Sequence, residues 1–228
     1  MAHRPAFLIL IAAFLGTPAI ASDFYVAAHG GLSLERDQTS RGTGGEFDAI
    51  GIDFDPGFEV GGSIGYLLFE SETGRIRTEL ELSYRENSVN RGFTLDGEQD
   101  FFGDASSLAG MLVAYYDFLG LSDRFIPFIG AGAGIAGVEN DVFYRPQVGI
   151  PEAPPVEIGG KTDTEFAWQA IIGVAIPITG HFDFTADGRF YSAGSPDWVR
   201  IVGGDAITGR FKSEFETWHI TAGFRFRF

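Results

Sequence analysis

The sequence contains no cysteine among its 228 residues. This absence excludes a disulfide-linked scaffold, a thiolate metal site and a cysteine nucleophile. Basic residues are also scarce, since 16 Lys and Arg stand against 31 Asp and Glu, for a formal net charge of −15. Nucleic-acid binding needs a clustered basic face, so no nucleic-acid partner is expected. Phe and Gly are abundant instead, at 23 and 32 residues, which is unusual for a soluble core built mainly from Leu, Ile and Val.

The first 21 residues have the pattern of a secretory signal peptide. Arg4 supplies a basic start, residues 6–15 are apolar, and Ala-Ile-Ala at 19–21 provides the small residues that signal peptidase recognises. The apolar stretch is shorter than the roughly 20 residues that a transmembrane helix needs. We therefore expect residues 1–21 to be cleaved on export and residues 22–228 to form one domain. A buried N-terminal helix is the alternative.

Beyond this segment, the recurrent pattern is alternation with period two, which predicts strands with two different faces. Between Arg75 and Arg85, apolar or uncharged side chains at even positions alternate with polar, mostly charged side chains at odd positions. Eight segments are assigned as strands on this basis: 24–34, 58–68, 75–85, 108–118, 125–138, 166–176, 182–191 and 218–228. In three of them both faces are apolar or small, so the pattern does not fix which way Met111, Val113 and Ile171 point.

The connections between these segments alternate in length. The predicted long loops are 35–57, 86–107, 139–165 and 192–212, and the predicted short turns are 69–74, 119–124 and 177–181. An antiparallel meander with all long loops at one end produces this alternation directly. The aromatic residues near strand ends favour lipid over water as the surroundings, because transmembrane barrels carry aromatic girdles. We therefore predict an all-β fold, an eight-stranded antiparallel up-and-down transmembrane β-barrel with long extracellular loops and periplasmic termini.

Several strands resemble those of known outer-membrane proteins. The C-terminal Phe224, Phe226 and Phe228, two residues apart, are similar to the insertion signal of Gram-negative outer-membrane barrels. The segments IRTELELSYR, VAYYDF, FIPFIGAGAGIAG and FDFTADGRFY resemble strands of the OmpA-like and opacity-type eight-stranded proteins. This resemblance implies an outer-membrane location and recognition of the C-terminal Phe by the barrel-assembly machinery. It implies no cofactor.

The polar faces of the strands are expected to point inward. An eight-stranded barrel is just wide enough to be filled by side chains. The inward positions are nearly balanced in charge, which suits a buried ionic network because an unpaired charge costs several kcal/mol. A structural filling is favoured over a gated ion path. The predicted interior network comprises Arg77, Glu79, Glu81, Arg85, Asp183, Asp187, Arg189, Arg225 and Arg227, with Glu59 and Asp117 as further inward acids.

Two histidines, His29 and His219, fall on the inward parity of the first and last strands, which barrel closure makes neighbours. They are weak candidates for a metal site or an acid–base pair with Glu79 or Glu81 as the carboxylate. Polar filling of the lumen is the favoured interpretation, since no histidine-rich spacing accompanies them.

The negative charge is concentrated in the predicted long loops. Residues 35–57, 86–107, 139–165 and 192–217 together hold 21 acids and eight bases. Lipopolysaccharide phosphates are also anionic, so contact with lipopolysaccharide and outer-membrane lipids would need divalent cations as a bridge. Otherwise the rim would have to stand clear of the membrane. Solubility and repulsion of neighbours is the favoured interpretation of the acidic rim, and cation-bridged contact with lipopolysaccharide, or contact with a basic host or phage surface, is the functional alternative.

These observations favour a non-enzymatic outer-membrane protein that supports envelope integrity and presents acidic loops for interaction or adhesion. A lipid-A-modifying enzyme of the deacylase or oxidase type is the alternative, with polar groups at the outer rim or the His29 and His219 pair as the residues to suspect. A small channel is the third hypothesis, which the narrow lumen disfavours.

Overall fold

A computed structural model of the chain describes residues 23–36, 38–43, 50–94, 97–145, 156–159, 162–194, 197–202, 205–212 and 215–228. The predicted signal peptide therefore lies outside the described residues. Within them the fold is all β, and no helix is long and apolar enough to cross a membrane. The strands are β1 (Phe24–Glu35), β2 (Gln38–Thr43), β3 (Ile50–Phe54), β4 (Gly57–Glu70), β5 (Gly74–Thr94), β6 (Gly97–Phe118), β7 (Ile126–Arg145), β8 (Val156–Gly159), β9 (Asp163–Pro177), β10 (Phe182–Ala193), β11 (Asp197–Val202), β12 (Asp205–Lys212) and β13 (Phe215–Arg227).

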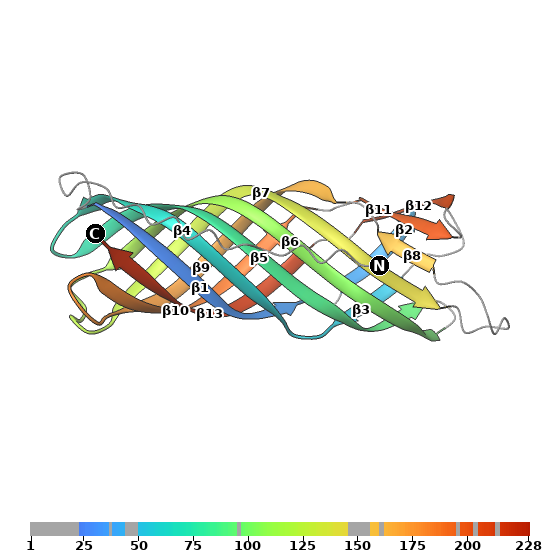
Figure 1. Ribbon diagram of the computed structural model, residues 1–228, viewed down its shortest axis with the longest axis horizontal. Helices are drawn as coiled ribbons and strands as arrows, with labels where there is room; N and C mark the ends of the chain where they lie inside the picture. The colour runs from blue at the N-terminus through green and yellow to red at the C-terminus, as the bar shows by residue number, and fades with distance from the viewer. Residues whose placement is uncertain are drawn as a thin grey trace.

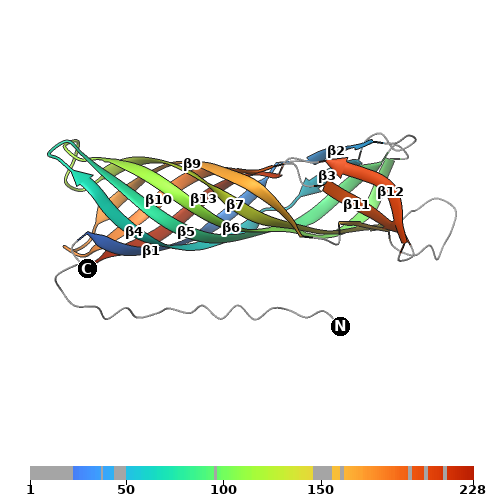
Figure 2. The same ribbon diagram turned by 90° about the horizontal axis from the view of Figure 1, so that it is seen from above.

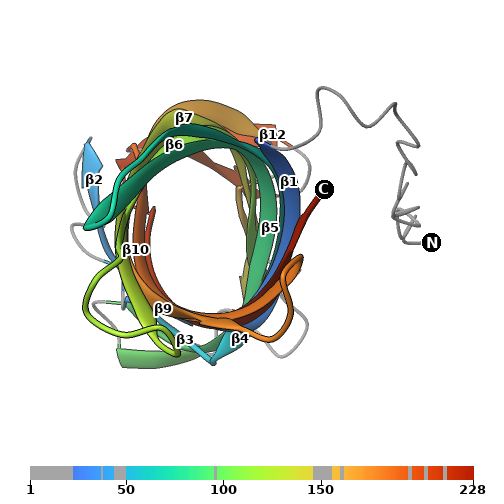
Figure 3. The same cartoon turned by 90° about the vertical axis from the view of Figure 1, so that its left-hand side faces the viewer.

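Eight of these strands close into an antiparallel ring. The order is β1, β4, β5, β6, β7, β9, β10 and β13, and β13 pairs again with β1 from Tyr25↔Arg227 to Glu35↔Thr217. Figure 3 looks along this ring from the end near the C-terminus. The connections at that end are short and lie at 71–73, 119–125 and 178–181, close to the predicted turns. We call it the short-turn end. The eight-stranded barrel predicted from the alternation is confirmed.

The barrel continues beyond this ring as a second closed ring, which corrects the prediction of long loops. Here β5, β6 and β7 are joined by β8, β11, β12, β2 and β3, and β3 pairs back with β5. We call β2, β3, β8, β11, β12 and the parts of β5, β6 and β7 that pair in this ring the crown. Figure 2 shows β2, β3, β11 and β12 beyond the ends of β9, β10 and β13. The five short strands, which are β2, β3, β8, β11 and β12, each directly follow or precede a strand of the barrel ring. The crown therefore lengthens the barrel and does not form a separate layer (Figure 1).

The predicted loops 35–57, 86–107, 139–165 and 192–212 therefore contain strands. The reason is visible in β5, where the outward residues beyond Tyr84 change to Glu86, Ser88 and Asn90 while the inward Asn87 is also polar. Once both faces are polar, alternation of an apolar and a polar face disappears although the backbone remains extended.

The outer surface of the barrel ring carries an apolar band. Side chains that point outward include Leu80, 67% exposed, Ile220, 64% exposed, and Leu112, 63% exposed. Aromatic rings flank the band, with Phe24 against Tyr66 and Phe182 against Phe224 near the short-turn end. On the crown side, Phe190 packs between Trp168 and Trp218, with ring centroids 5.3 and 4.9 Å apart. Apolar exposure between two aromatic belts is the arrangement of a barrel in lipid.

The inner surface is divided into an apolar and a polar part. A cluster of buried apolar side chains follows the inner faces of β6, β7 and β9 and reaches Ile52, Phe101 and Phe215 towards the crown. Met111, Val113 and Ile171, whose facing the alternation left open, all point inward. The charged side chains lie mainly on β4, β5, β10 and β13 and form the candidate site.

Candidate functional site

The interior network predicted from the sequence lies in the lumen. Arg77, Glu79, Glu81, Arg85, Asp183, Asp187, Arg189 and Arg225 are buried there, and Arg227 is one-third exposed at the short-turn end. Successive side chains of a strand point to opposite faces, so the network residues of one strand, which are an even number of positions apart, share its inner face. The structure adds Arg75, which is 7% exposed. With Glu59 and Asp117, the network then contains six arginines and six carboxylates.

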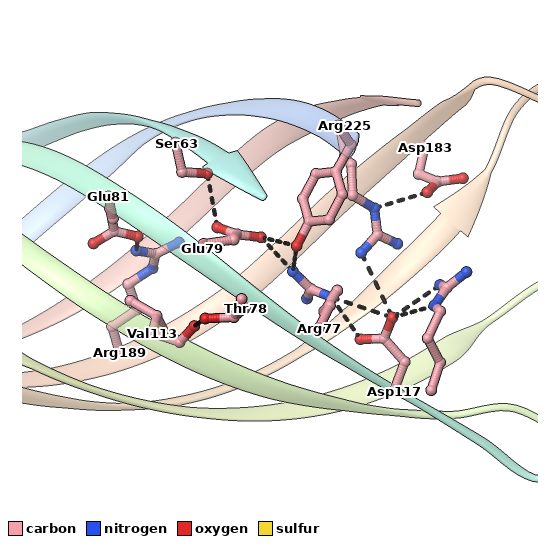
Figure 4. A network of polar contacts seen from close by, with 12 residues as sticks. Ser63, Arg77, Thr78, Glu79, Glu81, Val113, Asp117, Asp183, Arg189 and Arg225 are labelled. Atoms are coloured by element: carbon pink, nitrogen blue, oxygen red, sulfur yellow. Dashed lines mark hydrogen bonds and ion pairs between the residues drawn. The ribbon is translucent and has the colours of Figure 1, made fainter. Parts of the chain in front are cut away.

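Asp117 lies among three arginines near the short-turn end and accepts hydrogen bonds from two of them. Arg75 donates through Nε at 2.9 Å, and Arg77 donates through Nε at 3.0 Å. Arg225 approaches from β13 with its Nη1 3.6 Å away. Arg225 also donates through Nε to Asp183, which in turn accepts from Arg227 at 2.9 Å. Figure 4 shows the labelled Arg77, Asp117, Arg225 and Asp183 converging in the lumen.

Glu79 holds the next layer. Its carboxylate accepts hydrogen bonds from Tyr25 and Ser63, each at 2.7 Å, and forms an ion pair with Arg77. The Arg77 guanidinium also lies over the ring of Tyr115, 3.8 Å from its centroid. Tyr25 in turn needs the bare backbone of Gly65, because a Cβ there would lie 2.1 Å from the tyrosine ring. The Tyr25 ring therefore packs directly against the backbone of β4.

Glu81 and Asp187 share Arg189. Glu81 accepts from Gln169 and from Arg189, both at 2.9 Å. Arg189 donates through Nε to Asp187 at 2.5 Å, and Thr221 donates to the same carboxylate at 2.8 Å. Every charged group of this layer has an opposite charge and a neutral donor or a second charge beside it. Such mutual pairing is what allows ions to remain in a lumen of low dielectric constant.

The two histidines flank Glu59, an inward acid that the sequence analysis placed in the lumen but did not pair with them. His29 Nε2 and His219 Nδ1 each lie 3.7 Å from a Glu59 oxygen, and Arg85 Nη2 lies 3.6 Å away. Glu79 and Glu81, the partners expected from the sequence, contact arginines instead. Across the part of the chain that the structure describes, no group of three or more His, Asp or Glu side chains has the arrangement of a metal site. Both Glu59 oxygens and both His219 nitrogens lack a hydrogen-bond partner within the protein. Buried polar atoms of this kind are the usual partners of buried water molecules.

The network also contains neutral residues that were not part of the predicted network. Tyr25, Tyr115, Tyr191 and Gln169 all point inward, and Arg85 lies 3.4 Å from the centroid of the Tyr191 ring. Arg75 could have been found, because it shares the parity of Arg77 at the start of the same strand. The same rule applies to two of the tyrosines, because Tyr25 shares the inward parity of His29 and Tyr191 shares that of Arg189.

Polar side chains reappear on the outer surface just beyond the aromatic belt on the crown side. Tyr84 donates to Glu86 at 2.5 Å, and Ser88 donates to Asp104 at 2.8 Å. Arg36 donates to Glu216 at 2.6 Å. Further outward carboxylates at this level belong to Asp55, Glu139 and Asp141. The change from apolar to acidic side chains marks the level at which the strands leave the lipid.

The C-terminal phenylalanines lie on the outer surface at the short-turn end. Phe224, Phe226 and Phe228 are 49%, 42% and 43% exposed, and Phe226 meets Phe228 edge to face. Their exposure places the alternating aromatic pattern of the sequence on one accessible stripe of β13.

The comparisons with known proteins agree with this geometry. A family model described as outer membrane protein beta-barrel domain matches residues 6–227. A search of curated proteins finds no match. Among solved structures, the chain is similar to OprG from Pseudomonas aeruginosa, with 14% identity, 91% of this chain and 98% of that chain covered and a TM-score of 0.56. It is also similar to the outer membrane protease OmpT from Escherichia coli. The identity is 7%, the match covers 94% of this chain and 99% of OmpT, and the TM-score is 0.57. The match with Neisserial surface protein A has 18% identity and a TM-score of 0.46, and it covers 91% of this chain and 99% of that protein.

Proposed function

Because this chain belongs to the outer membrane protein β-barrel family and resides in the cell outer membrane, we propose that it is a non-enzymatic envelope protein that acts through its extracellular surface. In this class the short turns face the periplasm, so the crown lies on the extracellular side. The crown then extends the barrel away from the membrane as a platform for interaction or adhesion and supports envelope integrity.

One observation carries this proposal, namely that side chains occupy the interior and that each interior arginine lies within ion-pair distance of a carboxylate. Paired arginines and carboxylates fill one side of the lumen, and apolar side chains fill the other. A cavity deep in the lumen, beside Arg77, Glu79 and Arg189, measures only about 30 Å³, the volume of roughly one water molecule. A filled interior favours a function in binding at the outer surface over transport of ions or solutes through the lumen.

The outer surface suggests the partner. Asp104, Glu139 and Asp141 are exposed just beyond the aromatic belt, at the level where lipopolysaccharide phosphates would lie. Two anionic surfaces repel each other unless a cation lies between them. We therefore propose that the crown contacts lipopolysaccharide through divalent cations, and that Phe228 with its stripe on β13 is the signal for the barrel-assembly machinery.

Binding of the purified barrel to lipopolysaccharide in maltoside micelles tests this proposal. Binding should require Mg²⁺, disappear with a chelator and weaken severalfold when Glu139→Gln and Asp141→Asn are combined. Glu72→Gln with Asp123→Asn is the matched control, since both acids are exposed in the turns at the short-turn end. Binding that ignores Mg²⁺, or an equal loss in the control, would contradict the proposed contact.

A lipid-A-modifying enzyme is the second candidate. The observation that favours it is the polar group formed by Tyr84, Glu86, Ser88 and Asp104, which faces outward at the level of the lipid headgroups. The similarity to a protease at 7% identity concerns the fold alone. The two candidates differ in whether lipid A itself changes.

A further inference from the structure

A cavity of about 250 Å³ lies at the short-turn end of the lumen. We call it the mouth cavity. Its lining is rich in arginine, and its polar members are Asp23, Tyr25, Glu70, Arg75, Arg77, Arg225 and Arg227. Glu70, whose side chain is 50% exposed, and Arg227, whose side chain is 33% exposed, place its opening at the barrel end. A cavity of this size has room for a phosphate group together with several waters, because a water occupies about 30 Å³.

Arginine supplies most of the hydrogen-bond donors around this cavity. Each guanidinium offers five N–H donors, so the four arginines provide about twenty. The two carboxylates that hold them, Asp117 and Asp183, offer about four acceptor positions each. Glu79 is already occupied by Tyr25, Ser63 and Arg77. Glu70 reaches only Arg75, at 3.6 Å.

Three guanidinium nitrogens of the lining are buried and have no hydrogen-bond partner. One of them, Nη2 of Arg75, still forms an ion pair with Asp117 at 2.8 Å, so two are left without a partner of either kind. They are Nη2 of Arg225, a residue only 2% exposed, and Nε of Arg227. Because a buried charged donor without an acceptor is costly, an acceptor from outside the protein is expected there. The remaining nitrogens of Arg225 are committed, with Nε on Asp183 and Nη1 facing Asp117, so the guanidinium is held in place.

We propose that the mouth cavity binds a phosphate group, held by Arg225 and Arg227 on β13 with Arg75 and Arg77 facing it from β5. Guanidinium groups match phosphate oxygens through paired, charge-assisted hydrogen bonds. The phosphate could come from a free phosphate ion in the periplasm or from the headgroup of an inner-leaflet phospholipid. This site is at the opposite end from the crown and does not depend on the function proposed above.

Calorimetric titration of the purified, folded barrel in a phosphate-free maltoside detergent tests the site. Two probes are used, inorganic phosphate and phosphatidylglycerol carried in the same micelles. Saturable binding of inorganic phosphate identifies the free ion as the ligand, whereas saturable binding of phosphatidylglycerol alone identifies the lipid headgroup. Either result supports a phosphate site, and absence of saturable binding by both probes overturns it.

Variants separate the cavity from general positive charge. Arg227→Gln should weaken binding about tenfold or more, the effect of losing one charge-assisted hydrogen bond. Arg227→Lys retains the charge but lacks Nε, so it should fall between Arg227→Gln and the unaltered protein. Arg124→Gln is the control, because Arg124 is exposed in the turn between β6 and β7 at the same end and does not line the cavity. Equal weakening by Arg124→Gln overturns the assignment, and heat-modifiable gel mobility verifies that each variant is folded.

Discussion

Arg189 on β10 and Glu81 on β5 form an ion pair of 2.9 Å across the lumen. Three strands separate β5 from β10 in either direction around the ring, so the two residues come from opposite walls. Arg225 on β13 and Asp117 on β6 are related in the same way, at 3.6 Å. These contacts brace the barrel across its width, in addition to the hydrogen bonds between neighbouring strands.

Replacing Arg189 should therefore destabilise the barrel strongly. Arg189→Gln leaves Glu81 and Asp187 without their shared cation, and loss of one partner of a buried ion pair costs about 3–5 kcal/mol. Adding Glu81→Gln should recover part of that loss, because one uncompensated charge is removed. Urea unfolding of the barrel in lipid vesicles, followed by tryptophan fluorescence, measures both values. A cost below about 1 kcal/mol for Arg189→Gln would argue against a bracing role.

Adding a single methyl group at Gly65 should also destabilise the barrel. Gly65→Ala would place Cβ 2.1 Å from the Tyr25 ring and displace the hydroxyl that donates to Glu79. Overpacking of this kind costs about 1–3 kcal/mol in unfolding free energy. Gly110→Ala is the control, because a Cβ there would meet nothing within 4 Å. Equal unfolding midpoints for the two variants would contradict the packing of Tyr25 against β4.

The position of the lipid boundary can be measured with arginine substitutions. Leu80→Arg places a charge in the middle of the apolar band and should cost about 2–4 kcal/mol. Leu121→Arg puts the same residue in a turn at the short-turn end, where the cost falls to about 0–1 kcal/mol. Leu121 is 72% exposed and Leu80 is 67% exposed, so exposure alone does not distinguish them. Similar costs at both positions would place the membrane elsewhere on the barrel.

The filled lumen should conduct poorly. Purified protein in a planar bilayer is expected to give no steady stepwise current, because paired charges and apolar side chains fill the middle of the lumen. The cavity there measures about 30 Å³, and the mouth cavity of about 250 Å³ lies at the short-turn end. Regular current steps from the unaltered protein would restore the channel hypothesis. Arg189→Gln should raise the baseline leak if the ion pairs help to seal the lumen.

The fold was predictable because membrane strands display their two faces so clearly. Residues 75–85 and 218–228 alternate apolar and polar side chains without interruption, and both are strands with those faces. The crown was not predictable by the same rule. Its strands leave the lipid, so the outward face of β5 becomes polar at Glu86 while Asn87 points inward.

The interior partners could not be read from the sequence either. Parity identifies Arg189 and Glu81 as inward residues, but their pairing depends on the stagger of strands around the ring, which alternation does not encode. The same holds for Glu59, whose position between His29 and His219 follows from the register of β1 against β4 and β13. The inward residues show that positive and negative charges nearly balance, but they do not show which arginine pairs with which carboxylate.

The central claim, that the protein works through its surface and leaves its lipid surroundings chemically unchanged, is tested most directly by mass spectrometry of lipid A. Lipid A is compared between a deletion strain, the parent strain and the complemented deletion. The account predicts identical lipid A masses in all three strains. A lipid A species that changes on deletion and returns on complementation would contradict it and identify the protein as a lipid-A-modifying enzyme.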